Sequence, residues 1–135
     1  MIAPLRADET AAAIALWKAA GLTRSWNDPA ADIAAALACP ASDILAARDD
    51  AGTLVGTVMV GFDGHRGWLY YLAVAEARLG EGFGRALIQF AEAWLAERGA
   101  PKAQLMIRED NAAVAGFYAA FGYERSEVMV LGKRL

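Results

Sequence analysis

WLYYLAVAEARLGEGFGRALIQF, residues 68–90, reads as a strand, a short connector, a glycine loop and a helix in direct succession. Its glycines at positions 80, 82 and 84 alternate with larger residues just where the helix begins. Glycine lets the backbone come close to a bulky anion, and a helix N-terminus carries about half a unit of positive charge. The loop therefore suits a pyrophosphate, although a tight turn without any ligand would use the same glycines.

Three familiar phosphate-binding loops do not match this segment. A P-loop continues with Lys and then Ser or Thr after its last glycine, whereas Arg85-Ala86 follows here. The dinucleotide-binding fingerprint has wider glycine spacing, and the glycine loop of protein kinases belongs to a far longer chain. The loop is therefore of another kind.

The rest of the chain alternates between predicted helices and predicted strands. Asp28-Pro29 favours a helix start, because Asp is a preferred N-cap and Pro suits the first helical position. Turns at 49–52 and at Asp63-Gly64 predict an antiparallel meander. The predicted elements are strand 1–6, helices 10–20 and 29–38, strands 44–48, 54–62 and 67–74, the helix that Gly99 closes, strand 103–108, helix 112–121 with Asn111 as its cap, and strand 127–131. This order, β-α-α-β-β-β-α-β-α-β, is an α+β arrangement.

Length and composition predict a single domain over residues 1–135. The single cysteine, Cys39, has no partner for a disulfide, and no cluster has metal-ligand spacing. No apolar run approaches the ~20 residues of a membrane helix, and the first residues lack the pattern of a secretory signal. We therefore expect a cytoplasmic protein without a membrane partner. The net charge of −3 argues against a nucleic-acid partner.

Three segments, taken together, resemble the GNAT acetyltransferase family. That family has a Leu-x-Val strand, a Gln/Arg-x-x-Gly-x-Gly/Ala loop and a later Asn-x-x-Ala-x-x-Phe-Tyr helix that ends in Gly-Phe or Gly-Tyr. The matching segments here are Leu72-Ala-Val74, GEGFGRAL from Gly80, and Asn111 through Phe117-Tyr118 to Gly122-Tyr123. The chain is also similar to a short bacterial stand-alone subgroup in 26–29, 63–68 and 131–135. The resemblance implies a mixed, mostly antiparallel sheet of six to seven strands with about four helices.

The resemblance also implies a reaction and a set of contacts. Acetyl-CoA would be the co-substrate, without a metal, and an amine of a small molecule or peptide would attack it directly in a ternary complex. Tyr118 would donate a proton to the leaving thiolate, although on spacing alone it continues the apolar stripe of the last helix. The expected cofactor contacts are Leu72, Ala73, Val74, Leu79, Gly80, Glu81, Gly82, Phe83, Gly84, Arg85, Asn111, Phe117 and Tyr118.

This sequence departs from the family pattern in the glycine loop and at the positions that supply the general base. Leu79 stands where the family has Gln or Arg, and Glu81 places a negative charge beside the proposed anion site. Met106, Tyr70 and Tyr71 stand where other members offer a Glu, so deprotonation of the amine is left to ordered water or to Asp63, His65 or Glu109. The candidate acceptor-side residues are Trp26, Asp63, His65, Tyr70 and Tyr71.

The sequence is compatible with two functions from different classes. The first is an N-acetyltransferase, and the second is a non-catalytic acetyl-CoA-binding sensor or regulatory module, suggested by the missing carboxylate base. The acceptor's identity is open, and the protein is expected to be a monomer or a homodimer.

Overall fold

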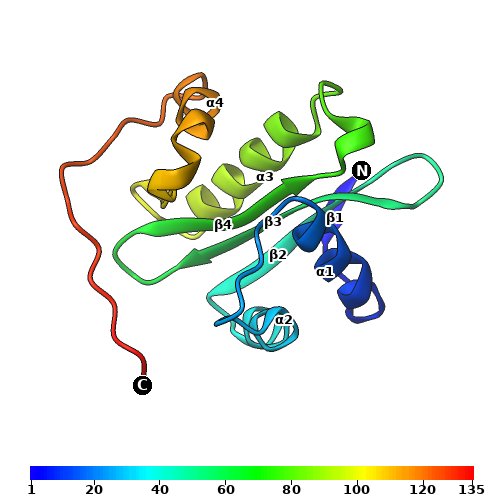
Figure 1. Cartoon of the computed structure of the whole chain (residues 1–135), viewed down its shortest axis with the longest axis horizontal. Coiled ribbons are helices and arrows are strands. Elements are labelled where there is room, and N and C mark those ends of the chain that lie inside the picture. The colour runs from blue at the N-terminus through cyan, green and yellow to red at the C-terminus, as the bar shows by residue number, and fades with distance from the viewer. The chain divides into compact units, whose positions relative to one another are not determined.

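The computed structural model describes all of residues 1–135, and the chain forms two compact units, Met1–Leu105 and Met106–Leu135 (Figure 1). The first unit holds a sheet and three α-helices. The second holds short helical segments and an extended C-terminal stretch. No helix has the length and apolar character needed to cross a membrane.

The sheet has five strands in the order β1-β2-β3-β4-β5. The first four pair antiparallel as a meander, and β5 lies parallel to β4. Their bounds are β1 Ile2–Pro4, β2 Ser42–Arg48, β3 Leu54–Phe62, β4 Gly67–Val74 and β5 Ala103–Leu105. The antiparallel meander is thus as predicted from the two turns, and the α+β class is as predicted from the order of the elements.

The predicted sixth strand is wrong, and so is the expected sheet of six to seven strands. Residues 127–131 are not in a strand, and they pair with no neighbour in the sheet. Met129 and Leu131 are 88% and 89% exposed. An apolar run of suitable composition becomes a strand only where another strand satisfies its backbone groups.

Helices cover both faces of the sheet (Figure 1). Helices α1 (Thr10–Ala19) and α2 (Pro29–Ala38) pack on one face, and α3 (Phe83–Glu97) packs on the other. Helix α2 begins as predicted, because the Asp28 side chain accepts a hydrogen bond from the Ala31 N–H and Pro29 fills the first helical position. The apolar positions predicted for α3, from Leu87 to Leu95, are buried.

A bulge interrupts the pairing of β3 with β4. Thr57 lies opposite Ala73 and Met59 lies opposite Tyr70, so two residues of β4 face one residue of β3. Leu69 and Leu72 consequently both pack in the cluster under α3, although they are three residues apart. An extra residue of this kind re-aims side chains along the strand.

The last predicted helix and the strand before it also differ from their predicted bounds. A six-residue 3-10 segment, Glu109–Val114, precedes a short helix α4, Ala115–Ala119, where a helix over 112–121 was predicted. Asn111 does not cap that helix: it lies inside the 3-10 segment with φ −124° and ψ 34°. The predicted strand over 103–108 is too long: β5 ends at Leu105, and residues 106–108 lie in no strand.

Candidate functional site

The glycine loop leads into α3, whose N-terminus has no side-chain cap. Gly80 and Gly82 have φ angles of 82° and 91°, which only glycine adopts at little cost. Gly82 is the N-cap of α3, and the first hydrogen bond inside the helix runs from the Ala86 N–H to the Gly82 carbonyl. The N–H groups of Phe83 and Gly84, in the first turn of α3, therefore lie at its positive end, an arrangement that favours an anion.

Arg78 offsets the negative charge that Glu81 brings to this loop. Its Nε and Nη2 donate to the two carboxylate oxygens of Glu81, at 2.9 and 3.2 Å, and its Nη1 donates to Asp49 Oδ2 at 3.0 Å. The guanidinium also lies 5.3 Å from the centre of the Phe83 ring. Glu81, whose hydrogen bonds to Arg78 contribute most to raising the arginine's pKa, is therefore paired rather than an isolated negative charge.

The strand before the loop has an edge that the sheet leaves open. β5 pairs with β4 only over Gly67–Leu69, so the same edge of residues 70–74 has no neighbour in the sheet (Figure 1). Leu72 and Val74 lie on this open stretch, and both pack their side chains in the cluster under α3. An unpaired strand edge can accept an extended ligand in the manner of another strand.

Tyr71 is fixed at the bulge from both its backbone and its ring. It is the one non-glycine residue with positive φ, 51°. Its carbonyl accepts a hydrogen bond from Thr57 Oγ1 at 3.0 Å, and Thr57 Oγ1 accepts one from Trp17 Nε1 at 2.8 Å. The Trp17 indole stacks on the Tyr71 ring at 3.8 Å with the planes 7° apart.

The Tyr71 phenol donates to a carboxylate of another element. Its OH lies 2.8 Å from Oδ2 of Asp32, which belongs to the first turn of α2. Burial, and then the hydrogen bond to Asp32 and its negative charge, raise the pKa of Tyr71 to about 12. The phenol therefore keeps its proton at neutral pH and directs it at Asp32.

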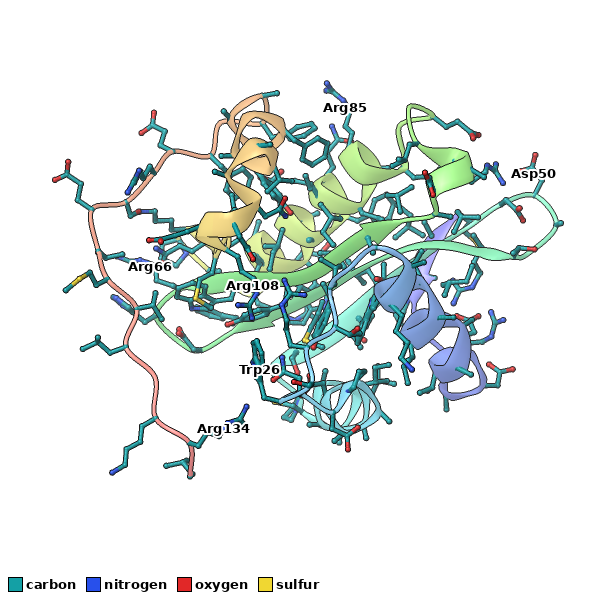
Figure 2. All side chains as sticks on the ribbon, in the orientation of Figure 1. Trp26, Asp50, Arg66, Arg85, Arg108 and Arg134 are labelled. Carbon is teal, nitrogen blue, oxygen red and sulfur yellow. The ribbon has the colours of Figure 1, made fainter.

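The other acceptor-side candidates lie elsewhere in the first unit. Asp63 holds the β3–β4 turn: it accepts from the N–H groups of His65 and Arg66 and from Trp68 Nε1. The backbone hydrogen bonds from Arg66 and then His65 are the chief cause of its lowered pKa, which makes it a weaker base. His65 is exposed, and the half-exposed Tyr70 stacks near Trp68. Trp26, 53% exposed, lies on the connector between α1 and α2 (Figure 2).

The remaining predicted residues belong to the second unit. Tyr118 lies on α4, half-buried, and burial raises its pKa. The rings of Phe117 and Tyr123 pack edge-on against it, at 5.2 and 5.9 Å. The apolar stripe and a protonated phenol are thus both present at this position.

Sequence reasoning missed Asp32 and Thr57. Asp32 is separated from Tyr71 by 39 residues, and Thr57 from Trp17 by 40, so no local spacing connects them. The one available signal was Asp32's place in a well-capped helix, which says nothing of what its carboxylate contacts.

Comparison with known proteins is consistent with this geometry. Residues 8–123 match the model of the acetyltransferase (GNAT) family. An acetyltransferase of Yersinia pestis strain Pestoides F is 46% identical over 128 residues, which cover 95% of this chain and 90% of that protein. An acetyltransferase of Pectobacterium atrosepticum is 45% identical over 130 residues, covering 96% of this chain and 92% of its own length.

Solved structures share the fold at low sequence identity. A putative acetyltransferase from Agrobacterium tumefaciens superimposes with a TM-score of 0.81 at 19% identity, over 99% of both chains. AAC(6')-Iy in complex with the bisubstrate analogue CoA-S-monomethyl-acetylneamine gives a TM-score of 0.82 at 16% identity, over 100% of this chain and 97% of that one.

Proposed function

The chain belongs to the acetyltransferase (GNAT) family, and from that premise we propose that it transfers the acetyl group of acetyl-CoA to an amine of a small molecule or peptide. The observation that carries the proposal is the uncapped start of α3 beside the open edge of β4. A CoA thioester has one part that suits each: a pyrophosphate and an extended arm with amide groups. The solved complex of AAC(6')-Iy with a CoA bisubstrate analogue supports the same choice.

The pyrophosphate is proposed to bind the loop through its backbone. The donors are the N–H groups of Gly80, Gly82, Phe83 and Gly84, with Glu81 and Arg85 at the rim. Leu79, 64% exposed, supplies no charge, so binding rests on the amides and on the helix dipole. The pairing of Glu81 with Arg78 removes much of the repulsion expected from the sequence.

The pantetheine arm is proposed to lie along β4. Its amides would hydrogen-bond with the backbone of Leu72 and Val74 on either side of Ala73, as an added strand does. This places the thioester carbonyl near the bulge at Tyr71, where the strand direction changes. Asn111 and Phe117 are proposed as further cofactor contacts from the second unit.

The transfer is proposed to be a direct attack in a ternary complex. The amine nitrogen, once its first proton has left to water, forms a bond to the thioester carbon. The nitrogen then loses a second proton to solvent, and the carbon–sulfur bond breaks. Tyr118 protonates the departing thiolate and recovers a proton from solvent. Burial raises the pKa of the phenol, so the phenol carries its proton before the thiolate appears. Residues 1–135 would then act as one catalytic domain.

A direct assay tests this function. Purified protein is mixed with acetyl-CoA and spermidine, neamine or a lysine-containing peptide, and CoA thiol release is followed together with the mass gain of one acetyl group on the amine. We expect Tyr118→Phe to lower kcat by about tenfold or more, as loss of a general acid does, with acetyl-CoA affinity unchanged.

Tyr123→Phe is the matched control, because it removes a phenol from a neighbouring ring of the same unit. Equal turnover by the Tyr118→Phe protein and the wild type would remove Tyr118 from the chemistry. Acetyl-CoA binding without acetylation of any amine would favour a non-catalytic acetyl-CoA sensor over an enzyme.

A further inference from the structure

We infer that Asp32 and Tyr71 form the subsite that binds the positively charged amine of the acceptor. The inference rests on the proposed function and adds to it a substrate class, the alkylammonium cation. It also places a carboxylate for binding on the acceptor side, where positions 70, 71 and 106 have none.

Asp32 carries a negative charge that the protein leaves unpaired. None of the ion pairs of the chain includes Asp32, and its hydrogen bond comes from the neutral Tyr71 phenol. Its side chain is half-buried, so it is reachable from solvent but less hydrated than a surface carboxylate. A cation from outside the protein would therefore neutralise the charge of Asp32.

The pair offers a ligand only lone pairs. The Tyr71 proton is directed at Asp32 Oδ2, so the phenol oxygen can only accept further hydrogen bonds, as can the second carboxylate oxygen of Asp32. An alkylammonium has three N–H donors and no acceptor, which matches this pair. An acidic acceptor would present negatively charged oxygens to these lone pairs. A hydroxylic acceptor has one O–H donor per group and no positive charge, so it would also bind less well.

The pair is held in place before any ligand arrives. The stacked Trp17 ring fixes the Tyr71 side chain, and the chain of hydrogen bonds through Thr57 fixes its carbonyl. The backbone of Tyr71 is also strained, at φ 51°, and such strain persists only where the surrounding structure imposes it. Rigid placement of this kind lowers the entropic cost of binding.

The position of Tyr71 in the chain puts the amine next to the proposed reaction. Tyr71 immediately precedes Leu72–Val74, the open edge proposed to orient the thioester. Asp32 would hold the ammonium beside the carbonyl and so act in binding. The proton leaves to water before the nitrogen attacks, because an alkylammonium, with a pKa near ~10.4, has no lone pair with which to attack.

Asp32→Asn tests the inference, since an amide keeps an oxygen for the Tyr71 hydrogen bond while it removes the charge. We expect the KM of spermidine, neamine or the lysine peptide to rise by about tenfold or more, because hydrogen bonds to charged groups are among the strong ones. The acetyl-CoA affinity and the melting temperature should stay at their wild-type values. An arylamine, neutral at pH 7, should lose little as a substrate or competitive inhibitor.

Asp50→Asn is the matched control, because it removes the same charge from the exposed tip of the β2–β3 hairpin (Figure 2). Calorimetry of each amine on the CoA-saturated protein separates this inference from the proposed function: if acetyl transfer fails altogether, amine binding still decides the role of Asp32. The subsite is refuted if the wild type binds none of these amines, or if the Asp32→Asn protein binds them equally well.

Discussion

The two faces of the sheet are built differently, although the same strands supply both. Under α3 the buried cluster is apolar throughout, from Leu45 on β2 to Leu95 at the end of the helix. Under α1 and α2 the core contains Trp17 and Thr57, joined by hydrogen bonds to Tyr71 and on to Asp32. One face is held by packing alone, and the other by packing and a connected polar network.

This difference separates two ways of building a site. The α3 side carries the glycine loop, whose proposed binding groups are backbone amides positioned by an apolar helix. The α1/α2 side offers side chains whose positions depend on one another through the network. A mutation in the first core should therefore change stability alone, while one in the second should change stability and acceptor recognition together.

The largest effect on stability is expected from the apolar face. Leu87 is fully buried and fits over Gly56, where an added Cβ would lie 2.9 Å from Leu87 Cδ1. Leu87→Ala leaves a cavity and should lower the free energy of unfolding by about 2–5 kcal/mol, measured by urea denaturation. The amine KM of the protein that remains folded should not change. A loss below about 1 kcal/mol would contradict the close packing under α3.

Thr57→Val should have a smaller effect on stability but a wider one on function. Valine keeps the shape and removes the hydroxyl, which leaves the buried Trp17 Nε1 without its partner. The free energy of unfolding should fall by about 1–3 kcal/mol, the usual cost of an unsatisfied buried group. The amine KM should rise, because the Tyr71 carbonyl loses its hydrogen bond.

Thr53→Val is the control for that variant, because Thr53 is exposed beside the β2–β3 turn. If Thr57→Val lowered stability and left the amine KM at the wild-type value, the network would be structural and the contrast between the faces would fail.

The smallest effect on stability is expected at the glycine loop. Gly82 has φ 91° and nothing within 4 Å of an added Cβ, so Gly82→Ala acts through backbone strain. That strain is about 1–2 kcal/mol for a left-handed residue, and its relaxation should lower acetyl-CoA affinity by about tenfold. Gly52→Ala is a close control: it has φ 81° and the same open surroundings, but lies in the β2–β3 turn. Equal acetyl-CoA affinity in all three proteins would contradict the loop's role.

The sequence predicted features whose cause is local. The Asp28-Pro29 start of α2, the buried stripe of α3 and the hairpin turns of the meander all follow from neighbouring residues. The family resemblance over Leu72–Tyr123 agrees with the family match over residues 8–123. The roles given to individual site residues, from Leu72 to Tyr118, stay predictions.

The features that sequence reasoning missed depend on distant partners. Val128–Leu131 has the composition of a strand but no neighbour to pair with, so the predicted sixth strand is absent. Asn111 has a good capping side chain, yet a 3-10 segment already begins before it. The bulge at Tyr71 and its contact with Asp32 arise only when β3, β4 and α2 meet.

Initial rates separate the two proposed binding roles, that of the loop amides for the acetyl donor and that of Asp32 for the amine acceptor. The wild type, Gly82→Ala, Asp32→Asn and the double variant are assayed over a grid of acetyl-CoA and amine concentrations. We expect Gly82→Ala to raise only the KM of acetyl-CoA and Asp32→Asn to raise only the KM of the amine. The double variant should show both changes, as independent sites do. A single KM moved by both substitutions would contradict these two roles.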